Sequence, residues 1–156
     1  MTNNDGMQLA IAKAQEGIAA GQTPFGTVIV HGGEIVAAAH NTVWRDGDPT
    51  AHAEINAIRL AAKRLGRIKL HGCTLYSTCE PCPMCLSASH WSRIDRVVFG
   101  ATIADAAAAG FAELCVPAAK LVTLGGSELR VETGPLRIEC ADLFRQWQAA
   151  GLSAPY

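Results

Sequence analysis

One histidine, one glutamate and two cysteines have the types and spacing that could perform metal-assisted chemistry. His52 and Glu54 are separated by one residue, and Cys82 and Cys85 follow in a Pro-Cys-x-x-Cys segment. Imidazole and thiolate groups are preferred zinc ligands, and a site with three protein ligands leaves the fourth tetrahedral position open for water. The pattern therefore predicts a catalytic site for one Zn²⁺ per chain, with His52, Cys82 and Cys85 as the metal ligands.

Glu54 is the candidate catalytic residue of this site. It lies two residues from His52 and need not bind the metal itself, so we expect it to move protons between metal-bound water and the reacting molecule. An isolated His-x-Glu pair is a weak signal, and its alternative role is a charge on a helix surface. The combination with Pro-Cys-x-x-Cys favours the catalytic role.

A closed structural zinc site is the main alternative. Cys79 forms a second Cys-x-x-Cys with Cys82, so His52 and three cysteines could complete a Cys₃His site without chemistry. The protein would then be a zinc-stabilised binding module, and Glu54 would have no task. We expect Cys79 at the end of a strand, whereas Cys82 and Cys85 share a helical turn, which favours the open site.

Both halves of the pattern are expected at helix N-termini. Cys82 fits an N-cap, with Pro83 at the first helical position, where proline is tolerated. The exposed N–H groups and the positive end of a helix dipole favour thiolates, the form that zinc binds. Hydrophobic periodicity and turn residues predict the surrounding elements. These are helices over residues 7–21, 51–65 and 138–150 and one that begins at residue 83, and strands over residues 27–30, 35–38, 74–78, 96–100 and 129–132.

The order of these elements predicts an α/β fold. A glycine turn joins the first two strands, which is typical of a hairpin. The strands over residues 74–78 and 96–100 are joined by a helix, and a crossover of that length makes two strands parallel. We therefore expect a single domain over residues 1–156, a three-layer α/β/α sandwich on a mixed sheet of about five strands.

Composition limits the choice of partners and of compartment. The chain has 13 lysines and arginines against 14 aspartates and glutamates, so we do not expect it to bind nucleic acid tightly. The one basic cluster, over residues 59–69, is interpreted mainly as a solvated helix face. No signal peptide and no apolar stretch of membrane-spanning length is recognised, which predicts a cytoplasmic protein. Cys73, Cys115 and Cys140 are expected to be small core residues.

The chain also resembles a known family over nearly its whole length. Its His-x-Glu and Pro-Cys-x-x-Cys pair is similar to that of the cytidine deaminase superfamily, and other segments resemble the bacterial guanine deaminase branch. The segments that carry this likeness are Pro24–Val30, His40-Asn41, Asp48–Ile55, Cys79–Cys85, Asp105–Ala107 and Gly110-Phe111. The resemblance implies a cytidine deaminase-like fold and hydrolysis of guanine to xanthine and ammonia. Zinc hydroxide would attack C2, and Glu54 would be the proton shuttle.

The same resemblance implies further site residues. Glu113 matches an acidic residue, usually aspartate, that assists at the amine, and its alternative role is a surface charge. Asn41 matches an asparagine that hydrogen-bonds the base, although asparagine is also a common turn residue. Phe25 and Trp91 are candidate walls of the substrate pocket, and either could instead be a core residue.

Tyr156 completes the predicted site. In guanine deaminases a C-terminal tyrosine covers the pocket across a dimer, which implies that residues 151–156 could form a lid here. Chain ends usually fray, which is the alternative for Tyr156. The resemblance therefore implies a homodimer that could exchange its C-terminal segments.

Several substrates remain open after this reasoning. Guanosine, cytosine and ammeline, an aminotriazine, carry amidine groups like that of guanine, and the shape of the pocket decides among them. The tRNA adenosine deaminases of the same superfamily are similar to this chain over Asp48–Ile55 and Arg93–Gly100. Recognition of RNA would require phosphate-binding side chains and a flipped base, and the balanced charge of the chain argues against it.

Overall fold

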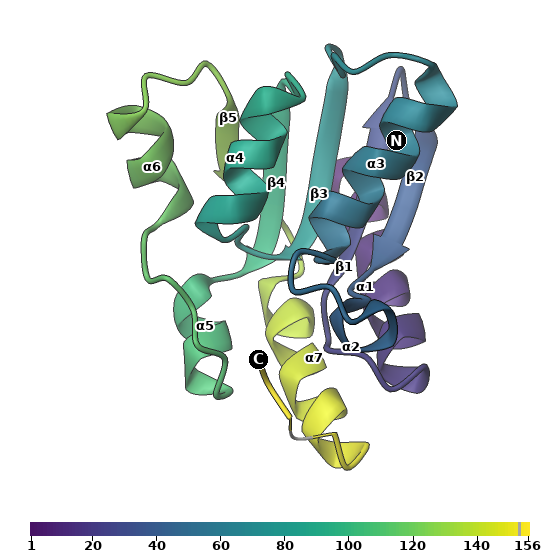
Figure 1. The fold of residues 1–156 in the computed structure, drawn as a ribbon, viewed down its shortest axis with the longest axis vertical. Coiled ribbons are helices and arrows are strands. Elements are labelled where there is room, and N and C mark those ends of the chain that lie inside the picture. Colours follow the sequence, from purple (N-terminus) through teal and green to yellow (C-terminus); the bar gives the residue numbers. More distant parts are fainter. Residues whose placement is uncertain (153) are drawn as a thin grey trace.

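A mixed five-stranded sheet forms the middle layer of the protein (Figure 1). The computed structural model describes residues 1–152 and 154–156. In the order in which they lie side by side, the strands are β2 (Glu34–His40), β1 (Gly26–His31), β3 (Cys73–Cys79), β4 (Arg96–Ala101) and β5 (Arg130–Thr133). Strand β1 pairs antiparallel with β2 and β3, whereas β3, β4 and β5 run parallel, which confirms the expected mixed sheet.

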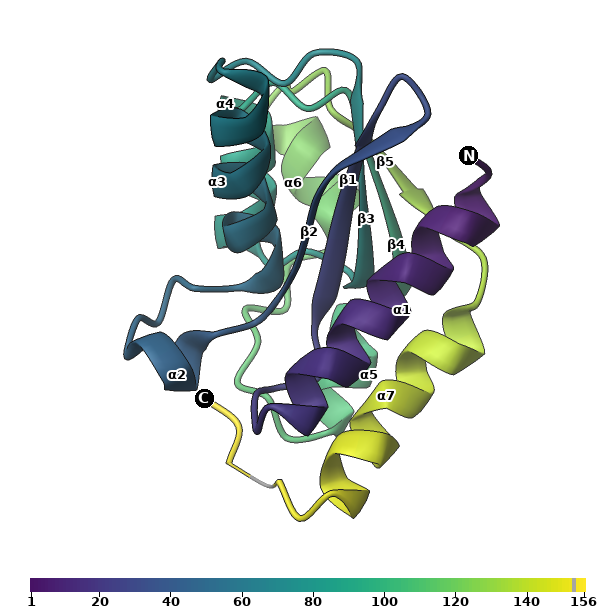
Figure 2. The ribbon, with the colours of Figure 1, turned by 90° about the vertical axis from the view of Figure 1, so that its right-hand side faces the viewer.

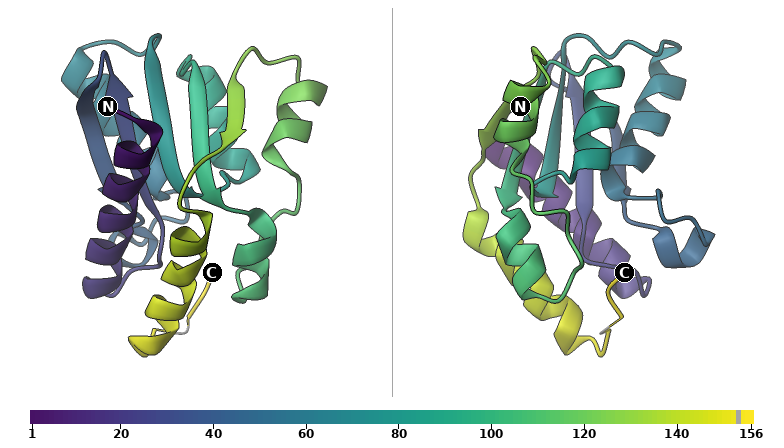
Figure 3. Two further views of the ribbon diagram at one scale, coloured as in Figure 1. Left: turned by 180° about the vertical axis from the view of Figure 1, so that it is seen from behind. Right: turned by 60° about the vertical axis from the view of Figure 1, so that its left-hand side comes forward.

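Helices cover both faces of this sheet, as the three-layer prediction requires (Figure 2). Helices α1 (Asn3–Ala19) and α7 (Arg137–Ala149) lie side by side on one face. Helices α3 (Ala53–Leu65), α4 (Pro83–Trp91) and α6 (Ala118–Leu124) lie on the other. The view from behind shows α7 beginning near the lower ends of the strands and extending below the sheet (Figure 3), and its contacts with the sheet are to β4 and β3.

The alternation of side chains along each strand creates two separate cores. On β4, Val97 packs among residues of the α3 and α4 layer, whereas its neighbour Val98 packs against the α1 and α7 layer. On β3, Leu75 and Tyr76 divide in the same way. Two buried apolar layers therefore fix the strand register, because a shift by one residue would exchange the two faces.

Three short helices and one cysteine differ from the expectations. Helices α2 (Val43–Asp46) and α5 (Ile103–Ala108), together with α6, lie in stretches where no helix was predicted. They are too short to show a clear hydrophobic period. Cys115 is exposed, not a core residue as expected, because it lies in irregular chain between α5 and α6. Within the described residues, every helix is too short or too polar to cross a membrane.

Candidate metal centre and active site

The three predicted metal ligands meet at the carboxyl-end edge of the parallel strands. His52 is the N-cap of α3, and Cys82 is the N-cap of α4, with Pro83 at the first helical position as expected. The Nδ1 atom of His52 lies 3.7 Å from the Cys82 sulfur and 3.5 Å from the Cys85 sulfur. Two ligands at Zn–N about 2.1 Å and Zn–S about 2.3 Å, held at a tetrahedral angle, lie roughly 3.6 Å apart. The geometry and the chemistry of these three groups therefore fit Zn²⁺.

The local environment favours ionisation of one sulfur. The hydrogen bond from Cys85, helped by His52, lowers the pKa of the Cys82 thiol to about 4, although burial opposes this shift. The same contact, together with burial, raises the pKa of Cys85 well above its usual value. Burial lowers the pKa of His52, but Cys82 and Glu54 outweigh it and raise the net value. A thiolate beside a histidine at two helix N-termini is a preorganised site for a cation.

Cys79 does not join this cluster. The ligand atoms of His52, Cys82 and Cys85 all lie within 4.8 Å of one another, and this group does not include Cys79. The Cys79 sulfur instead donates a hydrogen bond to the carbonyl oxygen of Thr102, at 3.5 Å. Cys79 ends β3, so its side chain is fixed by the strand and not by the helical turn that holds the other two sulfurs. The arrangement is that of an open three-ligand site.

Glu54 lies beside the three ligands in a buried position. Its Oε1 atom accepts a hydrogen bond from the Ser77 hydroxyl at 3.0 Å. Burial raises the pKa of the Glu54 carboxyl, while His52 and Ser77 oppose the shift. A carboxyl group with a raised pKa binds a proton more readily than an exposed one, which suits a role in proton transfer. Ser77 was not singled out from the sequence, since only the pairing of β3 with its neighbours places it opposite α3.

A small cavity joins these groups to most of the other predicted site residues. Its volume is about 20 Å³, which is room for about one water molecule. The walls are formed by Phe25, Asn41, His52, Glu54, Cys79, Glu80, Cys82, Glu113 and Tyr156. Burial raises the pKa of the Glu113 carboxyl, which lies in the irregular chain before α6 and not on a helix surface.

The C-terminal segment closes this cavity over its own chain. The Asn41 side-chain amide donates a hydrogen bond to the hydroxyl of Tyr156, and the Tyr156 ring lies 5.5 Å from that of His52. The Trp44 indole donates to the carbonyl oxygen of Ala154 at 3.2 Å and holds the segment in place. Burial raises the pKa of the Tyr156 phenol, so its hydroxyl remains protonated at neutral pH.

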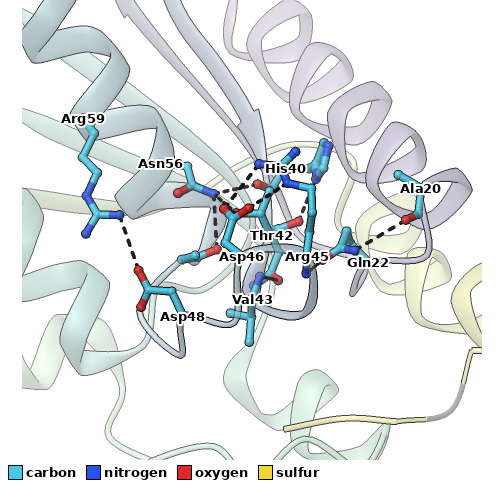
Figure 4. A network of polar contacts seen from close by, with 12 residues as sticks. Ala20, Gln22, His40, Thr42, Val43, Arg45, Asp46, Asp48, Asn56 and Arg59 are labelled. Carbon is cyan, nitrogen blue, oxygen red and sulfur yellow. Dashed lines mark hydrogen bonds and ion pairs between the residues drawn. The ribbon is translucent and has the colours of Figure 1, made fainter.

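A network of polar contacts joins the end of β2 to the start of α3 (Figure 4). The Asn56 amide nitrogen donates to the carbonyl oxygens of His40 and Ala51, at 3.1 and 3.2 Å, and to the hydroxyl of Thr42, at 2.9 Å. His40 and Thr42 flank Asn41 in the chain, and Ala51 directly precedes the metal ligand His52. Asn56 therefore ties the end of β2 to the start of α3, and so keeps Asn41 in a fixed position relative to the metal centre.

The two aromatic candidates have different places. Phe25 lines the cavity and also packs edge-to-face on Phe111 and Phe144, with ring centroids 5.0 and 5.8 Å away. Trp91 is 74% exposed and does not line the cavity, contrary to expectation. It ends the nine-residue helix that Cys82 caps, and a rise of 1.5 Å per residue places it about 13 Å from Cys82 and about 9 Å from Cys85 along the helix axis.

Comparison with known proteins agrees with this geometry. Residues 1–101 match the family described as the cytidine and deoxycytidylate deaminase zinc-binding region. The guanine deaminase of Bacillus subtilis is 49% identical over 112 residues, which cover 71% of this chain and 72% of that protein. The tRNA-specific adenosine deaminase of Aquifex aeolicus is 46% identical over 95 residues, which cover 61% of this chain and 63% of that protein.

A solved structure extends the similarity into the C-terminal part of the chain. It is a mutant protein in complex with 8-azaguanine, with a TM-score of 0.87 and 30% identity, and the match covers 95% of this chain and 85% of that chain. That mutant carries an Asn→Gln substitution, and a Glu→Asp mutant of the same protein with the same ligand also has a TM-score of 0.87.

Proposed function

Because the chain belongs to the cytidine and deoxycytidylate deaminase zinc-binding family, and is accordingly a zinc-dependent hydrolytic deaminase, we propose that its substrate is free guanine. The reaction consumes water and releases xanthine and ammonia, as the C2–amine bond breaks and a C2–oxygen bond forms. The observation that carries this proposal is the cavity itself. It brings one amide, three carboxyls and two aromatic rings around the metal ligands His52 and Cys82, under a closed terminal segment.

The chain's own residues have separate tasks in this reaction. His52, Cys82 and Cys85 would hold the zinc ion, which when bound would lower the pKa of a water molecule and so supply the nucleophile. Glu54 takes a proton from the attacking water, delivers it to the ring nitrogen next to C2, and later helps protonate the departing amine. Ser77 holds the carboxyl of Glu54 in the orientation that both transfers require.

Two further side chains are proposed to bind the base. The Asn41 amide hydrogen-bonds the polar edge of the purine, and Glu113 accepts from the amine that leaves. The neighbouring solved complexes with 8-azaguanine include mutants of an asparagine and of a glutamate, and this cavity presents both residue types. Phe25 offers an apolar surface for the ring.

Entry of the base requires Tyr156 to move. A cavity of about 20 Å³ holds about one water molecule and is much too small for a purine. The Tyr156 hydroxyl also accepts the hydrogen bond of the Asn41 amide to which the base would bind. We therefore propose that the C-terminal segment opens to admit the base and then closes, which excludes bulk water from the reaction.

The substrate is tested by measuring ammonia release from guanine, guanosine, adenine, cytosine, ammeline and a tRNA anticodon hairpin. We expect the highest kcat/KM for guanine, because a closed terminal segment leaves no room for a ribose or a phosphate chain. The Glu54→Gln variant measures the background release of ammonia. If any other compound has a higher kcat/KM than guanine, that compound and not guanine is the substrate.

Deamination of adenosine in tRNA is the second candidate, because the Aquifex aeolicus relative carries that name. Two properties of this chain argue against it. The formal net charge is −1, whereas RNA binding depends on basic side chains that contact phosphates. The terminal segment also covers the position through which a flipped nucleotide would have to enter.

We also propose that the protein forms a homodimer through the layer of α3, α4 and α6. Large apolar side chains on this layer are exposed to solvent: Leu60 at 49%, Trp91 at 74% and Leu124 at 75%. Exposed apolar side chains of this size are common at interfaces between subunits. Because Tyr156 reaches the cavity of its own chain, exchange of C-terminal segments is not needed to complete the site.

A further inference from the structure

The carboxylate of Glu80 connects the starts of two helices that flank the cavity. Its Oε2 atom accepts a hydrogen bond from the backbone N–H of Ile103 at 3.1 Å, and its Oε1 atom accepts one from the N–H of Ala118 at 2.8 Å. Ile103 is the first residue of α5, and Ala118 is the first residue of α6. One side chain therefore binds two helices whose starts are 15 residues apart in the sequence.

Both contacts are chemically favourable. The first N–H groups of a helix have no partner within the helix, and a negative charge there interacts favourably with the helix dipole. Hydrogen bonds to an ionised carboxylate are about twice as strong as those between neutral groups. Because both oxygens of Glu80 accept from backbone amides, this carboxylate is poorly placed to transfer protons, although it lines the cavity.

Glu80 is itself fixed to the metal centre. Its backbone N–H donates to the carbonyl oxygen of Ala101 at 2.8 Å, which holds it at the joint end of β3 and β4. The metal ligand Cys82 follows two residues later. The backbone hydrogen bond to Ala101 and the short chain to Cys82 therefore restrict movement of Glu80 relative to the metal centre.

The chain between the two bound helices carries Glu113. From Ala109 to Pro117 this chain has no regular structure, and the buried Phe111 packs it against Phe144 and Trp147 of α7. Its two flanking helices are in addition joined at the Glu80 carboxylate. We propose that Glu80 is a positioning residue, which holds the Glu113 segment at a fixed distance from the metal centre. This proposal rests on the catalytic role proposed for Glu113.

Hydrogen exchange tests the structural half of the proposal without any substrate. In Glu80→Gln one of the two acceptors is replaced by an amide NH₂ group, which cannot accept from a backbone N–H. We expect the amides of residues 103–118 to exchange at least tenfold faster in this variant, while those of β3 and α4 are unchanged and zinc content stays at one per chain. Unchanged exchange over residues 103–118, or loss of zinc, would overturn the proposal.

A double-mutant cycle tests the functional half, using whichever substrate the ammonia-release survey shows to be turned over fastest. We expect Glu80→Gln to lower kcat about tenfold to a hundredfold with KM changed less than threefold, since a misplacement of about 1 Å can cost that much. In the Glu113→Gln background, Glu80→Gln should lower kcat less than threefold, because position 113 no longer carries a carboxyl group to be positioned.

A matched variant controls for loss of a helix cap in general. Asp5→Asn removes a carboxylate that accepts from the Thr2 N–H at the start of α1, far from the cavity, and should leave kcat unchanged. Equal losses from Glu80→Gln in the wild-type and Glu113→Gln backgrounds would contradict the positioning role. If Glu113→Gln is fully active while Glu80→Gln is not, the role proposed for Glu113 fails and this inference fails with it.

Discussion

At the scale of single residues, the side chains of the cavity divide into those that hold the metal and those that move protons. The sulfurs of Cys82 and Cys85 lie at the distances from Nδ1 of His52 that a tetrahedral zinc ion requires, and all three ligand atoms lie within 4.8 Å of one another. Glu54 is buried beside them and is held by Ser77. A carboxyl group whose pKa is raised by burial is better suited to exchanging protons than to binding a metal.

Replacement of Glu54 by glutamine should remove activity without unfolding the protein. Glutamine has nearly the same shape and can still accept from the Ser77 hydroxyl, but it cannot carry the proton. We expect kcat to fall by about a thousandfold or more, in the upper range for loss of a general acid–base group. Steady-state ammonia release measures the activity, the zinc content measures metal binding, and thermal unfolding measures the stability.

The Ser77→Ala variant is the companion to that measurement. It retains the Glu54 carboxyl but loses its hydrogen bond, so its loss of activity should be much smaller. An active Glu54→Gln variant would show that another group moves the protons.

At the scale of elements, helix starts and one terminal segment build the site. The N-termini of α3 and α4 present the metal ligands, and the starts of α5 and α6 meet at Glu80. The segment that ends at Tyr156 closes the cavity by contacts with Asn41 and Trp44. It is the element whose position must change when a base enters.

Removal of the Tyr156 ring should affect turnover more than stability. In Tyr156→Ala the cavity stays open to solvent, and we expect kcat/KM to fall tenfold to a hundredfold because closure excludes water and completes the site. The melting temperature should change by less than about 3 °C, since the residue is at the chain end. Steady-state kinetics with guanine measure kcat/KM, and a thermal melt measures the melting temperature.

Tyr156→Phe separates the ring from the hydroxyl. The phenylalanine ring can keep the contacts with His52 and Phe111, so this variant should stay within about threefold of the wild type. Wild-type kcat/KM in Tyr156→Ala would exclude a role for the lid.

At the scale of the whole molecule, two apolar cores on either side of the sheet carry the site on a rigid frame. The site lies at the carboxyl ends of parallel strands, where ligands commonly bind in open α/β sheets. The outer surface of the α3, α4 and α6 layer carries three large exposed apolar side chains, those of Leu60, Trp91 and Leu124.

The proposed dimer gives a direct measurement at this scale. Light scattering should give a molar mass about twice the 16.4 kDa of the chain. The Trp91→Glu variant should shift it toward the monomer, because a charge would be buried in the interface. Trp91 lies outside the cavity, so zinc content should not change. A wild-type mass of one chain would contradict the proposal.

The sequence alone determined the parts that depend on local spacing. The His-x-Glu and Pro-Cys-x-x-Cys pair predicted the metal ligands, since a helix start fixes the direction of residues one to three positions apart. Alternation, periodicity and helix-start residues located the five strands and the four long helices of the described residues, most of which bury a continuous apolar face, although β5 is largely exposed. The short helices α2, α5 and α6 were not predicted, because they are too short to show a clear hydrophobic period.

Only the tertiary structure decided the contacts between distant segments. It separated Cys79 from the metal ligands, removed Trp91 from the cavity and brought Tyr156 onto Asn41, 115 residues away in the chain. It also revealed the two amides that bind Glu80. Local sequence patterns specify neither the distance nor the direction between elements, because these follow from how the two cores pack.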